Sequence, residues 1–185
     1  MPDSLLTLRR TGGRQLARIV YDEATIAARV AEMGEEIAGV YPDGGEPLLV
    51  LGLLKGSFIF LSDLVRHIPR PLHVDFIVAS SYGSGTTSSG RVSLLYDPST
   101  SLENKHIILV EDIVDSGTTL SRLVPMLEER GPKSLEICTL LHKHIAAHLV
   151  REPKWVGFDA PNEFLIGYGL DHSEDFRNLP FIGSL

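Results

Sequence analysis

Blocks of apolar residues recur along the chain, separated by polar segments rich in glycine, serine and proline. The run PLLVLGLL at 47–54 is continuously apolar, which is the pattern of a strand buried on both faces, and HIILVED at 106–112 repeats it. Shorter blocks of the same kind predict further strands at 73–80, 92–96, 134–141, 155–158 and 164–168.

Segments with helical periodicity lie between these strands. In the segment 22–37, apolar Ile26, Val30 and Met33 share one face, and Asp22 is suited to cap the helix. Further helices are predicted at 57–68, 118–130 and, more briefly, near 145–151.

The alternation of strands and helices predicts an α/β fold with a mainly parallel sheet covered on both faces. In such sheets a ligand binds beyond the carboxyl ends of the strands. That rule singles out the loops at 55–57, 81–90, 112–119 and 142–144.

Composition narrows the class of protein. The 185 residues, 43% hydrophobic and 22% charged, suit one globular domain, and no internal repeat or long linker divides them. The apolar runs are too short to cross a bilayer, so we expect no membrane partner and a cytoplasmic location. The single cysteine, Cys138, excludes an internal disulfide. A formal net charge of -7, without any dense Lys/Arg run, argues against a nucleic-acid partner.

The segment IILVEDIVDSGTTL at 107–120 has the most informative chemistry. A buried strand delivers two carboxylates, Glu111 and Asp112, to its end, and a glycine-containing turn then opens a helix. Free N–H groups at such a turn can hold a phosphate, while the carboxylates suit ribose hydroxyls or Mg²⁺. From DSGT alone, a simple helix cap and turn is an equally good interpretation.

VEDIVDSGTTL also resembles the phosphoribosyl-pyrophosphate motif of the type I phosphoribosyltransferases. The resemblance implies that Glu111 and Asp112 engage the ribose hydroxyls and that Mg²⁺ is the cofactor. It implies a single domain over 1–185 of the type I phosphoribosyltransferase fold, with a small hood from about 1–40 and 155–185. The 5-phosphate would be held by the turn residues Asp115, Ser116, Gly117, Thr118 and Thr119.

Other segments resemble the hypoxanthine-guanine phosphoribosyltransferases, and the similarity extends from about Val20 to Ile182. LLKGS at 53–57 is similar to the loop that receives pyrophosphate, which implies that Lys55, Gly56 and Ser57 bind it. In that family the peptide bond before this lysine can be cis.

A Ser/Thr/Gly-rich stretch that begins SSYG at 80–83 resembles the mobile loop that closes over the site in that family. The resemblance places Ser81, Tyr82 and Gly83 in a lid, although composition alone fits an exposed hairpin loop better. Some relatives have lysine where this chain has Ser80 and Thr118, so substrate affinities are expected to differ.

LHKH at 141–144 follows a predicted strand, and the resemblance implies that Lys143 donates to the 6-oxo group of a purine. The histidines His142, His144 and His148 suggest a metal cluster, but no acidic or cysteine ligand accompanies them. A solvated helix start is the favoured interpretation of these histidines.

The last segments, WVGF at 155–158, FLIGYGLD at 164–171 and HSEDFR at 172–177, resemble the base-binding end of the family. The resemblance implies that Phe164 stacks on the purine and that the backbone of Leu165 reads its edge. Asp171 would sit beside the base and hold a second Mg²⁺ on the pyrophosphate. Arg177 matches an arginine that binds pyrophosphate.

Together the motifs imply a Mg²⁺-dependent purine-salvage enzyme that joins a 6-oxopurine, hypoxanthine or guanine, to the ribose of phosphoribosyl pyrophosphate. Asp115 is the candidate base for the proton that leaves N7 of the purine. Relatives commonly form homodimers or homotetramers, and the same is expected here.

Three alternatives stay open. The first is a regulatory relative that binds nucleotides or RNA, which the negative charge and the retained Lys143, Phe164, Asp171 and Arg177 argue against. The second is a relative that uses xanthine or a pyrimidine. The third is an unrelated doubly wound nucleotide-binding protein, but neither G-x-G-x-x-G nor G-x-x-x-x-G-K-[ST] is present.

Overall fold

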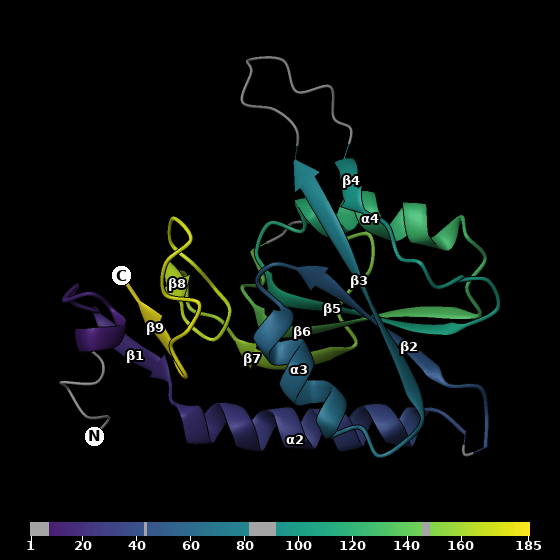
Figure 1. Ribbon diagram of the computed structural model, residues 1–185, viewed down its shortest axis with the longest axis horizontal. Coiled ribbons are helices and arrows are strands. Elements are labelled where there is room, and N and C mark those ends of the chain that lie inside the picture. Colours follow the sequence, from purple (N-terminus) through teal and green to yellow (C-terminus); the bar gives the residue numbers. More distant parts are fainter. Residues whose placement is uncertain (1–7, 43, 82–91, 146–148) are drawn as a thin grey trace.

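A six-stranded sheet forms the centre of the molecule in the computed structural model, which describes residues 8–42, 44–81, 92–145 and 149–185 (Figure 1). Its strands are β2 (Leu48–Leu54), β3 (Leu72–Ser81), β4 (Val92–Tyr96), β5 (His106–Val114), β6 (Ser134–His142) and β7 (Trp155–Asp159). They lie in the order β4-β3-β2-β5-β6-β7. Neighbours from β3 to β7 are parallel, and β4 alone runs antiparallel to β3. The predicted α/β class and mainly parallel sheet are confirmed.

Helices cover both faces of this sheet (Figure 1). They are α2 (Glu23–Val40), α3 (Phe58–Arg66) and α4 (Thr118–Glu128). Alternate residues of one strand point to opposite faces. On β2, Val50 packs with residues of α2 and α3, whereas Leu49 packs with residues of α4. Two buried faces explain why β2 and β5 are continuously apolar.

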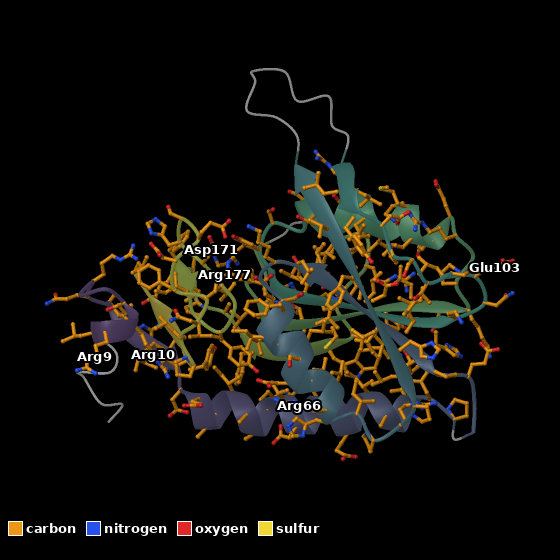
Figure 2. The ribbon with its side chains drawn as sticks, in the orientation of Figure 1. Arg9, Arg10, Arg66, Glu103, Asp171 and Arg177 are labelled. Atoms are coloured by element: carbon orange, nitrogen blue, oxygen red, sulfur yellow. The ribbon has the colours of Figure 1, made fainter. Side chains whose placement is uncertain are left out.

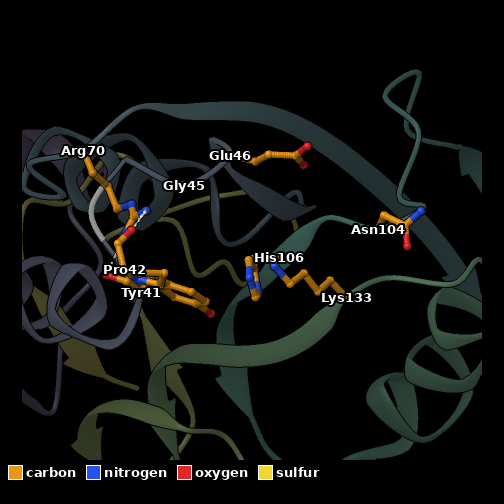
Figure 3. A pocket seen from close by; sticks show the side chains of 8 residues that line it. All are labelled: Tyr41, Pro42, Gly45, Glu46, Arg70, Asn104, His106 and Lys133. Atoms are coloured by element: carbon orange, nitrogen blue, oxygen red, sulfur yellow. Dashed lines mark hydrogen bonds between the residues drawn. The ribbon is translucent and has the colours of Figure 1, made fainter.

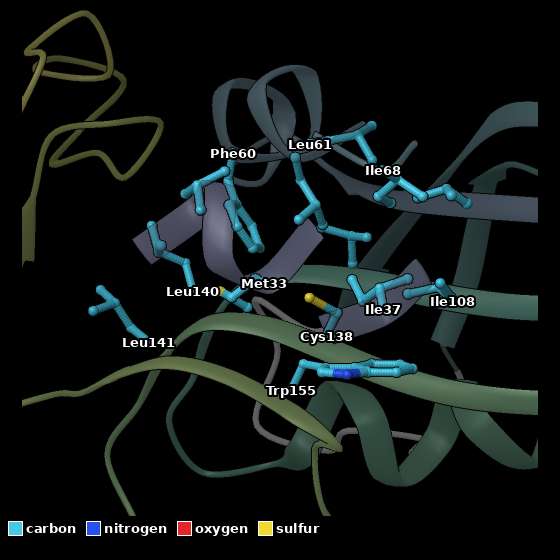
Figure 4. Packing of buried hydrophobic residues seen from close by; sticks show 14 of the residues in the cluster. Met33, Ile37, Phe60, Leu61, Ile68, Ile108, Cys138, Leu140, Leu141 and Trp155 are labelled. Atoms are coloured by element: carbon cyan, nitrogen blue, oxygen red, sulfur yellow. The ribbon is translucent and has the colours of Figure 1, made fainter. Parts of the chain in front are cut away.

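The larger core lies between the sheet and the pair α2 and α3 (Figure 4). Met33 and Ile37 from α2 and Phe60 from α3 are fully buried there, against Cys138 and Trp155 of the sheet. Burial raises the pKa of the Cys138 thiol. Truncation of one such side chain to alanine costs about 2–5 kcal/mol of unfolding free energy.

A second, three-stranded antiparallel sheet brings together segments far apart in the sequence. Its strands are β1 (Arg18–Tyr21), β8 (Leu165–Ile166) and β9 (Ile182–Ser184), in the order β1-β9-β8. The apolar pattern did not predict β1 or β9, which are only four and three residues long. The strand predicted at 164–168 is confined to β8, since the backbone turns at Gly167 and Tyr168, both with positive φ.

The predicted helix at 22–37 is confirmed and extends to Val40. Asp22 caps it as predicted, because its Oδ1 accepts the backbone N–H of Thr25 at 2.8 Å. The short helix predicted near 145–151 falls partly on residues 146–148, which lie outside the described part. No described helix is long and apolar enough to cross a membrane.

Candidate active site

Strands β2 and β5 are neighbours in the sheet, but the chain continues from β2 to β3 in one direction across the sheet and from β5 to β6 in the other. The sheet therefore has a topological switch point between β2 and β5. A cavity of about 260 Å³ opens beyond their carboxyl ends. It is lined by residues from three separate segments that the sequence motifs had singled out, among them Lys55, Gly56, Glu111, Asp112, Thr119, Asp171 and Arg177.

Two glycines allow the three segments to stack closely. A Cβ atom at Gly56 would lie 1.6 Å from Asp112 Oδ2, so only glycine lets the carboxylate rest on this loop. Gly169, with φ +103°, in turn lies directly over the carbonyl of Gly56. The Leu54–Lys55 peptide bond before this contact is cis, a form that it can take in the family that this chain resembles. The loop at 55–57 therefore lies between the end of β5 and the 167–177 segment.

The carboxylate residues near the end of β5, Glu111 and Asp112, are half-buried at the cavity. Burial raises the pKa of Glu111 well above its usual range, and repulsion by Asp112 adds to the effect. Burial likewise raises the pKa of Asp112 to about 6, against the opposing effects of the Ile113 N–H and Arg177. Glu111 Oε2 is buried and meets no hydrogen-bond partner in the described residues. Such groups attract a cation or a hydrogen-bond donor.

The turn after β5 forms a small hollow of about 70 Å³, lined by Glu111 and residues 113–120. Gly117 has φ +72° and directly precedes α4. Ser116 Oγ and Thr118 Oγ1 are hydrogen-bonded at 2.9 Å beside it. The hollow therefore combines hydroxyl groups with the positive end of a helix, and an anion of the size of a phosphate suits it.

Charged side chains connect the 55–57 loop to the 167–177 segment (Figure 2 labels Asp171 and Arg177). Arg177 pairs with Asp171 at 2.8 Å and donates to the Gly169 carbonyl at 2.8 Å. Lys55 Nζ lies 3.0 Å from Glu174 Oε1, and both side chains are largely exposed. Sequence reasoning missed Glu174. The only signal for it was its position in the charged segment DHSEDFR at 171–177.

Lys143 and Asp115 meet at the ends of β6 and β5. Lys143 Nζ lies 3.3 Å from Asp115 Oδ2, and the Lys143 N–H donates to the Val114 carbonyl at 3.0 Å. The lysine side chain is 12% exposed and the aspartate side chain 51%, so Asp115 is accessible to solvent whereas Lys143 is largely buried. A ligand edge with adjacent acceptor and donor atoms would fit this pair.

The remaining predicted base-binding residues lie on or near the second sheet. Phe164, just before β8, is 53% exposed, with its ring edge-to-face with His172 at 5.3 Å between centroids. Leu165 is buried in β8, so only its backbone is available to a ligand. The Phe164 ring is therefore accessible to a ligand.

Two other predictions depend on local detail. The Ser57 side chain is fully buried and its hydroxyl donates to the Leu53 carbonyl at 2.6 Å, so this residue offers a ligand only its main chain. Of the predicted lid, Tyr82 and Gly83 lie outside the described residues, and Ser81 ends β3.

The histidines show no metal geometry where they are described. The rings of His142 and His144 lie 3.9 Å apart, and His144 Nε2 is 2.6 Å from Asp159 Oδ1. Burial lowers the pKa of His142, with a smaller effect from His144. Within the described ranges, no group of three or more His, Cys, Asp or Glu side chains is arranged to hold a metal ion.

Comparison with known proteins gives consistent matches. The family model of the phosphoribosyl transferase domain matches residues 18–173. A hypoxanthine phosphoribosyltransferase of Salmonella typhimurium is 42% identical over 172 residues, which cover 93% of this chain and 97% of that protein. A hypoxanthine-guanine phosphoribosyltransferase of Mycobacterium bovis is 47% identical over 164 residues, 86% of this chain and 81% of that protein.

Solved structures agree with the sequence matches. A hypoxanthine-guanine phosphoribosyltransferase of Bacillus anthracis superposes with a TM-score of 0.85 at 41% identity, covering 92% of this chain and 99% of that chain. A hypoxanthine phosphoribosyltransferase of Staphylococcus aureus gives 0.87 at 39% identity, covering 100% and 96%. Since the family model matches residues 18–173 and relatives at 42% and 47% identity match 93% and 86% of the chain, this protein belongs to the phosphoribosyltransferase family.

Proposed function

We propose that the protein transfers the 5-phosphoribosyl group of phosphoribosyl pyrophosphate to N9 of hypoxanthine and of guanine. The products are the corresponding purine nucleoside monophosphate and pyrophosphate, which makes the reaction a step of purine salvage. The observation that carries the proposal is the pair formed by Lys143 and Asp115, 3.3 Å apart, in which Asp115 also lines the hollow at 113–120. The names of the relatives at 42% and 47% identity support the same acceptors.

Recognition of the base follows from the chemistry of this pair. The 6-oxo oxygen and N7 are neighbours on one edge of a 6-oxopurine. Lys143 would donate to the oxygen, while the Asp115 carboxylate would accept the proton at N7. Adenine presents an amino donor at position 6, which a lysine cannot satisfy. Phe164, whose ring is half exposed, would stack on the face of the base.

Binding of phosphoribosyl pyrophosphate would use the rest of the cavity. The 5-phosphate would enter the hollow at 115–119, beside the first turn of α4. The two ribose hydroxyls would donate to Glu111 and Asp112, the acids at the end of β5. The pyrophosphate would lie against the 55–57 loop, within reach of Lys55 and Arg177, which line the same cavity.

The donor set suits Mg²⁺. Glu111 Oε2 is buried without a partner among the described residues, and repulsion from Asp171 helps to raise the pKa of Asp112. A cation here would reduce the repulsion among the carboxylates of Glu111, Asp112 and Asp171. With no ready cluster of three acids in the described part of the chain, most ligands would come from substrate oxygens and water, as is usual for Mg²⁺. When bound, Mg²⁺ would neutralise charge on the departing pyrophosphate.

The reaction needs a bond from N9 to ribose C1 to form while the bond from C1 to the pyrophosphate oxygen breaks. Arg177 and Lys55 would hold the leaving group, whose charge grows as the bond breaks. The proton at N7 would pass to Asp115, which the Lys143 pairing holds in place. Catalysis by this acid depends on its position beside the base more than on its strength as a proton acceptor.

We also propose that the chain assembles as a homodimer or homotetramer. Five large apolar side chains on β3, β4 and at the start of α3 are 37–66% exposed, and a contact between chains would bury them: Phe58, Val74, Phe76, Leu95 and Tyr96. Light scattering coupled to size-exclusion chromatography would give the assembly mass, and a mass equal to one chain would refute the proposal.

Turnover tests the reaction directly. Purified protein with Mg²⁺ and phosphoribosyl pyrophosphate is assayed separately with hypoxanthine, guanine, xanthine, adenine and uracil. We expect monophosphate products from hypoxanthine and guanine, and no product after addition of a chelator. A protein that turns over none of these bases yet binds nucleotide or RNA would be a regulatory relative, and a preference for xanthine or uracil would correct the acceptor.

A further inference from the structure

A second cavity, of about 300 Å³, lies at the amino ends of β2, β5 and β6, at the opposite end of these strands from the candidate active site (Figure 3). His106, the first residue of β5, is one of its walls. Glu111 lies five residues further along the same strand, about 16 Å away at about 3.3 Å per residue. The cavity is therefore separate from the candidate active site.

Basic side chains dominate the walls of this cavity. Arg70, His106 and Lys133 contribute three basic groups, and among the described lining residues the one carboxylate belongs to Glu46, which is exposed. The Arg70 guanidinium is fixed by donating to the Tyr41 carbonyl at 3.0 Å and to the Pro42 carbonyl at 3.1 Å. Its Nε is buried and has no partner among the described residues.

Tyr41 forms the floor between these groups. Tyr41 is only 8% exposed, and its hydroxyl, which lies near the Ser134 side chain, makes no hydrogen bond of ordinary geometry in the part of the chain that the structure describes. Burial raises the pKa of Tyr41 to about 12, and the Glu136 carboxylate raises it further against the opposing effects of the Ser134 hydroxyl and Arg70, so the Tyr41 hydroxyl keeps its proton and can donate it. A buried polar group without a partner is uncommon and indicates a missing ligand or water.

His106 stands beside the Tyr41 ring, with 5.1 Å between the ring centroids. Its Nδ1 is 2.7 Å from Ser134 Oγ, which leaves Nε2 for a ligand. Burial lowers the pKa of His106, and the positive charges of Lys133 and Arg70 lower it further against the opposing effect of Glu46. An anion placed among these groups would satisfy them together.

We propose that this cavity binds the phosphate group of a small molecule, between Lys133, His106 Nε2 and the Tyr41 hydroxyl. A volume of about 300 Å³ is at the lower end for small-molecule sites, so a pentose phosphate suits it better than a whole nucleotide. The exposed Glu46 and the Asn104 side chain would then meet the sugar hydroxyls. Free phosphate and a sugar phosphate share the chemistry that the site recognises.

The His106 ring provides a local probe that the active site does not disturb. Its NMR signals, assigned by their loss in His106→Gln, are followed while inorganic phosphate or ribose 5-phosphate is added at constant ionic strength. We expect a saturable shift and a rise in the pKa of His106. Lys133→Ala should weaken binding about tenfold, because it removes a charge-assisted contact. Lys105→Ala removes a nearby charge outside the cavity lining and should leave binding unchanged.

The outcomes separate the ligands and can overturn the site. Tighter binding of ribose 5-phosphate than of phosphate would identify a sugar phosphate, and equal binding would mean that only the phosphate is recognised. His106 signals that stay fixed up to about 10 mM of either compound would overturn the proposal, as would equal shifts in the Lys133→Ala variant. Turnover is not measured here, so failure of this site would leave the proposed reaction untouched.

Discussion

Gly56 offers a sharp test of how the active site is assembled. In Gly56→Ala the new methyl group would start 1.6 Å from Asp112 Oδ2, and ordinary contact begins near 3.4 Å. The carboxylate must therefore move by about 1.8 Å, since the loop beneath it is fixed by Gly169 on its other side. The backbone at Gly56 does not need the left-handed conformation, so the perturbation is steric.

The expected consequence is a large loss of activity with a moderate loss of stability. A misplacement of about 1 Å at a reacting centre can cost about 10²-fold, so kcat/KM should fall by at least about 10²-fold. Rotation of one side chain relieves the overlap, and unfolding free energy should fall by about 1–3 kcal/mol. Steady-state kinetics and urea unfolding measure the two quantities.

A double-mutant cycle with Asp112→Ala identifies the cause. Once the carboxylate is absent, Gly56→Ala should reduce kcat/KM only slightly further. Gly39→Ala is the matched control, because this exposed helical glycine has open space around it and should leave kcat/KM unchanged. Wild-type kinetics in Gly56→Ala, or an equal loss in both backgrounds, would refute the steric reasoning.

Three further predictions concern single side chains. Asp115→Asn should lower kcat about 10²–10⁴-fold with hypoxanthine, and near-normal turnover would remove Asp115 as the proton acceptor. Lys143→Ala should lower kcat/KM for hypoxanthine by about 10–100-fold, measured against adenine, whose low rate should not fall in parallel. Asp75 is buried, and although burial alone would raise its pKa, the N–H groups of Thr100 and Phe76 lower it. Its stabilising effect should therefore be complete above the unfolded-state pKa and be lost as pH falls through the folded-state pKa. Asp75→Asn should cost about 1–3 kcal/mol at pH near 7 and less in acid, whereas an equal cost in urea unfolding at both pH values would contradict this.

The sheet and its loops could be predicted because their cause is local. β2 and β5 are apolar on both faces, and that pattern is visible in any short window of the sequence. The acids Glu111 and Asp112 lie in β5 itself, so the pattern that predicts this strand also predicts where they are. Placement of the site at the ends of these strands then required only the general rule for parallel sheets.

The second sheet and the charge contacts beside it could not be predicted in the same way. β1 and β9 are stabilised by pairing across more than 160 residues, as between Arg18 and Ser184, which no local pattern encodes. Glu174 meets Lys55 across 119 residues of sequence, and its backbone has φ +70°, a conformation that a non-glycine residue rarely adopts. The inward hydroxyl of Ser57 likewise depends on the carbonyl of Leu53, one turn back.

The backbone hydrogen bond from Lys143 to Val114 has a consequence for how such a site can change over time. It continues the β5–β6 ladder, in which Val114 lies opposite His142, so the distance between Lys143 and Asp115 is set by strand register. Substitutions inside β6 leave that register intact. Deletion of one residue from β6 would turn Lys143 to the other face of the sheet, since side chains alternate. New base preferences in this lineage should therefore arise by replacement of side chains, and insertions or deletions within β6 should be eliminated by selection.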